Sequence, residues 1–375
     1  MKRLPNLFIA LFACIIPPLL MMAGCGSLGA RAMKKERVNL NVALQQTGDE
    51  QLLLNLVRLR YRDTPAFLEV SSISTQSTFE ASLEGGAELE RNEVDTDIFS
   101  FIGTAGFSTQ PTLTYTPLQG ENFIQRLLTP LSLEKLMLLH QTGWNIRRVF
   151  RLCVQRLNDV KNAPRASGPT PEGIPEYKDY LRVLELLRDL EQRDDSLSIV
   201  YETDPSNETS PRMVMQIKPE ALQYAETEEL VNLLGLTPGK IHYPFNFPST
   251  QHGQPPNSDF IRVETRSFLG MLYYLSHAVK VSEHDLQKGK VTVTKDESGK
   301  PFDWKAVLGD SMNIVSQETV PSEASVAVYY RGKWFFIDDT DLESKSTFSL
   351  LYQIFALQAG KAEGILPILT LPVGK

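Results

Sequence analysis

Acidic side chains gather in the run Asp338-Asp339-Thr340-Asp341-Leu342-Glu343, where they could bind a divalent cation. Hard cations such as Ca²⁺ prefer clustered carboxylate oxygens. The run lacks the central glycine and the distal glutamate of an EF-hand loop. Thr340 and Glu343 have the spacing of a helix capping box, and acidic residues are favoured at helix N-termini. We therefore expect Asp338, Asp339 and Asp341 to begin a helix, and we expect no metal ion and no cofactor.

Ser132-Leu-Glu-Lys135 matches the Ser-x-x-Lys pattern of penicillin-recognising serine enzymes. In those enzymes a lysine amine lowers the proton affinity of the serine, and a Lys-Thr-Gly strand holds the substrate. The chain has no Lys-Thr-Gly element. Ser132 follows Thr129-Pro130 at an expected helix start, so we interpret it as a helix cap.

The five histidines are distributed without the spacing of a metal site. None lies in a His-Glu-x-x-His motif, and the cysteine thiolates that zinc also binds are scarce. His277 falls on an apolar helix and is expected to be half-buried with its hydrogen bonds satisfied. Cys153 shares a helical apolar face with Val149 and Phe150, which indicates a buried hydrophobe and not a nucleophile.

Basic residues concentrate around one expected helix of this acidic chain. A face formed by these arginines could receive an anionic partner such as a peptidoglycan carboxylate or a lipid phosphate. We favour the alternative that they pair with the acidic helix near residues 185–195. The residues are Arg126, Arg147, Arg148, Arg151 and Arg156.

The composition is that of a folded, acidic, disulfide-free protein. The net charge is −7, which becomes −9 if Lys2 and Arg3 are removed with residues 1–25. This acidity argues against binding to nucleic acid, which requires a basic surface. Of the three cysteines, Cys14 and Cys25 lie in the first 25 residues, so no disulfide within the mature chain is expected.

The N-terminus has the pattern of a secretory signal. Lys2 and Arg3 precede an uncharged apolar stretch from Leu4 to Met22, and small residues follow before Cys25. Pro17-Pro18 argues against a membrane-spanning helix. Met22-Ala23-Gly24-Cys25 resembles the lipobox of bacterial lipoproteins. The resemblance implies cleavage before Cys25, diacylglycerol (palmitate-type) lipid on its thiol and, because Gly26 is not aspartate, an outer-membrane location facing the periplasm.

Helical and strand patterns intermingle without repeats, which predicts an α+β fold of helices and antiparallel hairpins. A capping box at Thr47-Gly-Asp-Glu50 predicts a helix start. Residues 66–83 and 94–116 predict two strands or one long hairpin, and 326–337 predicts a hairpin around Arg331-Gly332. Further helices are expected near 119–128, 132–141, 145–157, 176–193, 219–235, 264–280 and 341–359. The expected division is 1–25 signal peptide, 26–46 tether, 47–157 N-terminal subdomain, 158–175 linker and 176–375 C-terminal subdomain.

Two segments, Leu52–Val70 and Tyr329–Phe348, resemble segments of uncharacterised lipoproteins of Gram-negative bacteria. That resemblance implies location and no activity. We expect a non-enzymatic envelope lipoprotein that binds or scaffolds, with other envelope proteins or peptidoglycan as partners. Two alternatives stay open. One is a cell-wall or envelope hydrolase that uses Ser132 and Lys135 or the acidic run. The other is a small-ligand binder with an aromatic pocket of Tyr273, Tyr274, Tyr329 and Trp334.

Overall fold

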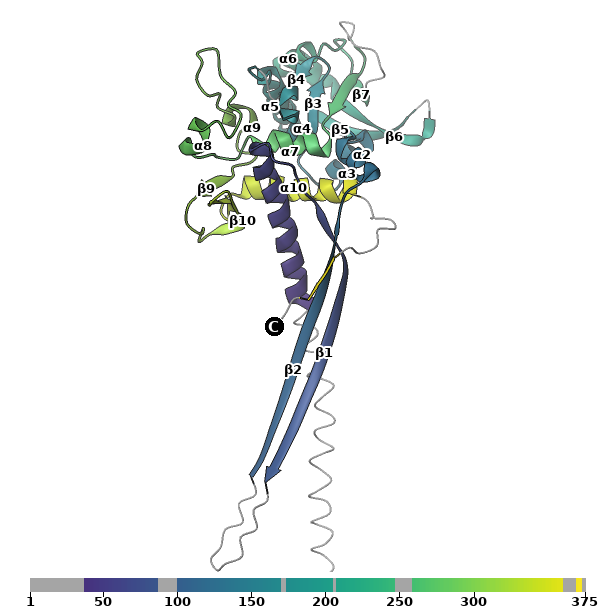
Figure 1. Cartoon of the computed structure of the whole chain (residues 1–375). Coiled ribbons are helices and arrows are strands. Elements are labelled where there is room, and N and C mark those ends of the chain that lie inside the picture. Colours follow the sequence, from purple (N-terminus) through teal and green to yellow (C-terminus); the bar gives the residue numbers. More distant parts are fainter. Residues whose placement is uncertain are drawn as a thin grey trace, which may run out of the picture. The chain divides into compact units, whose positions relative to one another are not determined.

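A computed structural model describes residues 37–86, 100–169, 173–204, 207–246, 258–359 and 369–372 (Figure 1). Its helices and mainly antiparallel strands make an α+β fold, which confirms the expected class. The expected signal peptide, Cys25, residues 26–36 and the tip of the long hairpin lie outside the described residues.

The chain divides into two compact units, and each is assembled from separated segments. Unit 1 contains the described residues of Met1–Asp63, Asn162–Lys178 and Leu272–Tyr352, and unit 2 contains those of Thr64–Lys161, Asp179–Met271 and Gln353–Lys375. This division interleaves the chain and differs from the two consecutive subdomains expected from sequence. The expected linker 158–175 contributes a strand and a 3-10 helix instead.

Unit 2 is built on a six-stranded sheet in the order β4-β3-β8-β7-β6-β5, with β7 and β8 parallel and the other neighbours antiparallel. Alternate residues of β8 are buried, which is the period of a strand with one face in the core. The strands are β3 (Val154–Leu157), β4 (Val160–Lys161), β5 (Leu197–Asp204), β6 (Asn207–Ile217), β7 (His242–Asn246) and β8 (Ile261–Thr265).

Helices supply the rest of the unit 2 core. Tyr180 of α5 donates its hydroxyl to the carbonyl of Phe150 in α4, and the Phe150 ring packs edge-on against Phe245 of β7. Phe67, Phe123, Phe268 and Phe355 form a second aromatic cluster. The helices are α2 (Glu121–Leu128), α3 (Leu133–Gln141), α4 (Ile146–Cys153), α5 (Lys178–Gln192), η2 (Pro219–Gln223), α6 (Ala225–Leu233) and α7 (Phe268–Ser276).

Arg266 is the largest fully buried side chain among the described residues and joins three segments of unit 2. Its Nη1 donates to the carbonyls of Arg151, Leu152 and Val154 at 3.2, 3.1 and 2.8 Å, where α4 ends and β3 begins. The last carbonyls of a helix have no partner within the helix, so a cation there satisfies them. The backbone of Arg266 also bonds Cys153 and Leu131.

Unit 2 also contains an unusually long hairpin, β1 (Leu68–Gly86) and β2 (Ser100–Pro117), seen as the two long blue arrows of Figure 1. The strands pair antiparallel from Leu68 opposite Pro117 to Gly86 opposite Ser100, as the sequence predicts. A third strand, β12 (Leu369–Pro372), pairs with β2 only over residues 112–115. The typical strand has five or six residues, so these are roughly three times longer.

Unit 1 combines the helix over residues 37–60 with a three-stranded sheet in the order β10-β11-β9. The helix buries Leu53, Leu56 and Val57, as its apolar spacing predicts, and the β10–β11 hairpin turns at Arg331-Gly332. The remaining elements are η1 (Pro164–Ser167), α8 (Glu283–Gln287), α9 (Lys305–Leu308), β9 (Val315–Gln317), β10 (Ala324–Tyr330), β11 (Lys333–Asp338) and α10 (Leu342–Ala359). The division between the units falls within α7 and α10.

Several predicted boundaries are wrong for identifiable reasons. Thr47 does not cap a helix, because residues 37–60 are all helical and its hydroxyl donates to the Ala43 carbonyl one turn earlier. The apolar period of α4 runs on into β3, so the helix predicted over 145–157 ends at Cys153. Likewise, the helix predicted over 264–280 begins only at Phe268, because residues 261–265 are strand β8.

Replacement of Arg266 by methionine is expected to destabilise unit 2 by about 3 kcal/mol, because buried carbonyls lose a charged donor. For a unit of this size the loss lowers Tm by roughly 6–12 °C, which calorimetry measures. Arg262→Met, in strand β8 just before Arg266, is the control, since that side chain is only half-buried. Equal Tm values for the two variants would show that the Arg266 bonds contribute nothing.

Candidate functional site

A cavity of about 660 Å³ lies in unit 1 and is lined by both charged and aromatic residues. Arg60, at the end of the helix over 37–60, and His277, just after α7, form part of its wall. Phe302 and Trp304 precede α9 on another part of the wall. Residues distant in sequence therefore meet at this cavity.

Aromatic rings hold His277 in place. Its ring stacks on Trp304 with centroids 3.7 Å apart and planes 11° apart, and Phe302 packs edge-on against Trp304 at 5.3 Å. Both ring nitrogens of His277 are buried and have no hydrogen-bond partner among the described residues. Burial, with the nearby charge of Arg60, lowers the pKa of His277 to about 3. The imidazole is therefore neutral at ordinary pH and offers one donor and one acceptor.

Arg60 is a guanidinium without a counterion in the part of the chain that the structure describes. Its Nη1 donates to the carbonyl of Thr292 at 3.2 Å. Its Nε is buried and makes no hydrogen bond, and no carboxylate of the described residues lies within ion-pair distance. Burial lowers the pKa of Arg60 from its ordinary value. Arg60 is half-buried, and a charge that is even partly removed from water is normally paired, so this arginine costs stability as it stands.

Sequence reasoning missed this site. His277 was expected to be half-buried with satisfied hydrogen bonds, and only the first part is right. Arg60 and Trp304 carry no local motif. Arg58 and Arg62 lie in the same stretch as Arg60, so the sequence carries no signal that separates Arg60 from its neighbours.

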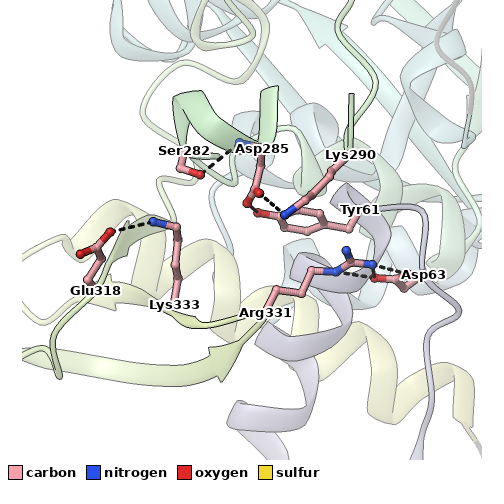
Figure 2. A network of polar contacts seen from close by, with 8 residues as sticks. All are labelled: Tyr61, Asp63, Ser282, Asp285, Lys290, Glu318, Arg331 and Lys333. Atoms are coloured by element: carbon pink, nitrogen blue, oxygen red, sulfur yellow. Dashed lines mark hydrogen bonds and ion pairs between the residues drawn. The ribbon is translucent and has the colours of Figure 1, made fainter. Parts of the chain in front are cut away.

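A second polar cluster in unit 1 is fully paired (Figure 2). The buried carboxylate of Asp285 accepts the Tyr61 hydroxyl at 2.8 Å and the Lys290 ammonium at 2.6 Å. The Lys290 bond holds the pKa of Asp285 below its ordinary value. Arg331 pairs with Asp63 at 2.8 Å and lies 4.9 Å above the Tyr61 ring. Because its groups satisfy one another, this cluster fastens α8 and β10–β11 to the end of the first helix.

Ser132 is the N-cap of α3, and Lys135 is the third residue of that helix. The Ser132 Oγ accepts the Lys135 amide of α3 at 3.4 Å. The Lys135 ammonium donates instead to Gln358 at 2.5 Å, and burial lowers its pKa. Ser132 is therefore a helix cap, as expected. The described residues show no hydrogen bond between the Ser132 hydroxyl and the Lys135 side-chain amine, so this pair does not support a hydrolase.

The acidic run is held by its own loop. Asp338 accepts the amide and hydroxyl of Thr340, and Asp341 accepts the amide and hydroxyl of Ser344. Asp339 pairs with Lys345 at 2.6 Å. The helix cap is therefore Asp341 and not Thr340, which corrects the predicted capping box. The described residues contain no group of three or more side chains suited to a metal ion.

The arginines of the predicted anionic-partner patch do not form one exposed face. Arg126 is exposed, whereas Arg147, Arg148 and Arg151 are half-buried. Arg147 lies near Glu185 and Asp189 of α5, but its Nε is buried without a hydrogen-bond partner among the described residues, and burial and the nearby Arg188 lower its pKa. Arg156 pairs with Glu264 at 3.4 Å.

The predicted aromatic pocket is wrong. Tyr274 is buried, Tyr329 is 59% exposed, and Tyr329 instead contacts Trp334 on the β10–β11 hairpin. Only Tyr273 borders a cavity described here, a water-sized one next to Arg60 and His277. Cys153 is buried as predicted, and burial raises the pKa of its thiol to about 12, which excludes a thiolate nucleophile.

Replacement of Asp285 by asparagine is expected to cost about 2 kcal/mol at pH 7, since the carboxylate accepts charged and neutral donors. The folded pKa is lowered, so this contribution is present above the unfolded value of about 3.9 and is lost as pH falls below it. Urea unfolding should show a constant gap between wild type and Asp285→Asn from pH 7 to 5 that shrinks below pH 4. A gap that persists unchanged to pH 3 would contradict the ion pair. Asp310→Asn, in a solvent-exposed pair with Lys305, is the control.

No helix in the described part of the chain has the length and apolar content needed to cross a bilayer. Comparison with protein-family models, curated proteins and solved structures found no match for this chain.

Proposed function

We propose that this chain is a lipid-anchored envelope protein, held by Cys25 at the outer membrane facing the periplasm, that scaffolds an assembly through its β1–β2 hairpin. The Met-Ala-Gly-Cys sequence and the preceding signal support the anchor. One observation carries the scaffolding role. The long hairpin has two strand edges without an in-chain neighbour over most of their described length.

The open edges are extensive. Eighteen residues of β2 rise about 60 Å at ~3.4 Å each, yet β12 covers only residues 112–115. Among the described strands nothing pairs with the outer edge of β1. An isolated two-stranded ladder is marginally stable in water, and an unpaired edge is a template for another strand. A partner strand would therefore supply hydrogen bonds that the hairpin lacks.

The hairpin has few of the residues that protect strand edges. Natural sheets blunt their edges with charged residues, above all lysine. β1 and β2 contain no lysine or arginine, and β2 contains no charged residue. The exceptions are three glutamates in β1 and Pro111 within β2. Serine, threonine, glycine and alanine predominate, which allows close approach of another strand.

The register of the ladder contains one β-bulge, between Val70 and Ser72. Beyond it the pairing is regular from Ser72 opposite Thr114 to Gly86 opposite Ser100. Near the start of the hairpin, Leu68 is 48% exposed whereas Thr114 and Thr116 are buried. The register pairs apolar residues at Ile73–Leu113, Phe79–Phe107 and Ala81–Ala105, and polar residues at Ser77–Thr109 between them.

A second copy of this chain is the partner that fits. A different protein could occupy one edge, but identical copies leave no edge open between neighbours. Two hairpins of the same orientation place β2 of one copy beside β1 of the next, and the strands then continue to alternate in direction. Copies anchored at the same membrane surface share that orientation. Each contact uses two different edges, so it propagates from copy to copy.

A second candidate function, binding of a small ligand, is favoured by the cavity around Arg60 and is compatible with scaffolding. The hydrolase alternative has no such support, because Ser132 and the acidic run are engaged in helix caps.

The anchor predicts that Cys25→Ala abolishes incorporation of a radiolabelled or alkynyl palmitate into the protein and releases it from membranes. Gly26→Asp is expected to keep the lipid but to move the protein to the inner-membrane fraction of a sucrose gradient. Cys153→Ala is the control and should keep full labelling, since that thiol is buried. Palmitate labelling of Cys25→Ala at the wild-type level would refute the anchor.

Strand pairing predicts that one of two neighbouring proline variants, Ser77→Pro or Thr78→Pro, blocks assembly. Alternate amides of a strand face opposite sides, so one proline removes an outer donor and the other removes a β1–β2 bond. Native mass spectrometry of the detergent-extracted lipidated protein should show oligomers for wild type. It should show monomers for the outer variant, with an unchanged circular dichroism spectrum. Monomeric wild type at all concentrations, or oligomers in both variants, would overturn the proposal.

A further inference from the structure

We propose that the cavity of unit 1 is a binding site for a small carboxylate with an apolar body, and that Arg60 holds the carboxylate. This inference is independent of the hairpin and of the anchor.

The argument begins with the missing counterion. Arg60 makes one side-chain hydrogen bond to a neutral carbonyl within the described residues, and its Nε is buried without a partner. A neighbouring buried group in unit 1 is fully paired. The nearby Asp285 takes both a lysine and a tyrosine. The sequence could satisfy Arg60 with an acid from a neighbouring element, but no such pair forms. An anion from outside the chain would complete it, and a planar guanidinium matches a carboxylate in geometry.

The other unpaired groups lie beside the same arginine. Both nitrogens of His277 and the hydroxyl of Thr292 are buried and unsatisfied. Arg60, His277 and Thr292 also share the wall of the adjoining water-sized cavity. Buried polar atoms normally have partners, so three residues without them at one point indicate a place built to receive polar atoms.

The rest of the wall limits what the ligand can be. Leu286, Leu308 and Met312 join Phe302 and Trp304 in lining it, which suits an apolar or aromatic body. Lys280 and Lys305 are its other basic residues, whereas Asp303, Asp310, Asp341 and Glu343 are acidic. The acids outnumber the bases, so a doubly charged phosphate meets more repulsion than a singly charged carboxylate. A volume of about 660 Å³ is within the range of small-molecule sites.

The test uses phenylacetate as probe, with phenylacetamide as the neutral isostere and inorganic phosphate as the simple anion. Saturation-transfer NMR and calorimetry on the full chain should show phenylacetate binding at least tenfold more tightly than either. Arg60→Met should weaken phenylacetate at least tenfold while raising Tm, because it removes an uncompensated buried charge. Arg58→Met, on the same helix, should change neither quantity.

Several results would overturn the proposal. These are no phenylacetate binding by wild type, undiminished binding by Arg60→Met, or phosphate binding as tight as phenylacetate. If Arg60→Met fails to fold, Arg60→Lys replaces it. The lysine keeps the charge but loses the planar fork, so affinity should still fall severalfold, and unchanged affinity would contradict the assigned role.

Discussion

The fold of unit 2 depends on hydrogen bonds to the buried backbone carbonyls at the end of α4, and the Arg266 guanidinium donates them. The end of α4 is buried beneath the start of the six-stranded sheet, so its carbonyls cannot reach water. A guanidinium delivered from the segment between β8 and α7 supplies the donors. The backbone of the same residue ties the sheet to Leu131, just before α3. The position of β3, and of the helices on either side of it, thus depends on one side chain from more than a hundred residues away.

In unit 1 the neighbouring residues Arg60 and Tyr61 differ in whether the charges at each position are paired. Tyr61 enters a cluster in which each charge has a partner, and the cluster joins α8 and the β10–β11 hairpin to the first helix. Arg60, one residue earlier, has no counterion among the described residues, and its Nε makes no hydrogen bond. The paired cluster contributes rigidity, whereas the unpaired arginine costs stability. Proteins commonly keep a destabilising group of this kind at a binding site, where the group is needed for function.

Local patterns in the sequence were sufficient for much of the fold. The Arg331-Gly332 turn between β-branched and aromatic arms gave the second hairpin, and the apolar spacing around Cys153 placed that thiol in the core. The candidate site could not be obtained this way. Arg60, His277 and Trp304 come together through tertiary packing, and no one of them has a distinctive neighbour in sequence. The interleaved units were missed for the same reason, since contacts between distant segments leave no periodic signal.

Errors at helix ends have a simpler cause. Thr47 and Thr340 both have capping-box spacing, but a threonine hydroxyl can equally bond a carbonyl one turn back or a nearby carboxylate. Asp341 then takes the capping position next to Thr340. The residue type indicated that a cap lay nearby, and the competition among local acceptors decided which residue it was.

The bulge between Val70 and Ser72 also constrains how the hairpin can change over generations. Because side chains alternate along a strand, a single inserted or deleted residue beyond the bulge exchanges the two faces for the whole outer ladder. The bulge itself is one such extra residue in β1. The alternation of residue types along β1 shifts by one residue at the same point. Length variation that keeps the alternation of the strands unchanged must therefore come in pairs of residues, matched on both strands. During evolution, each strand of the hairpin can therefore gain or lose only an even number of residues.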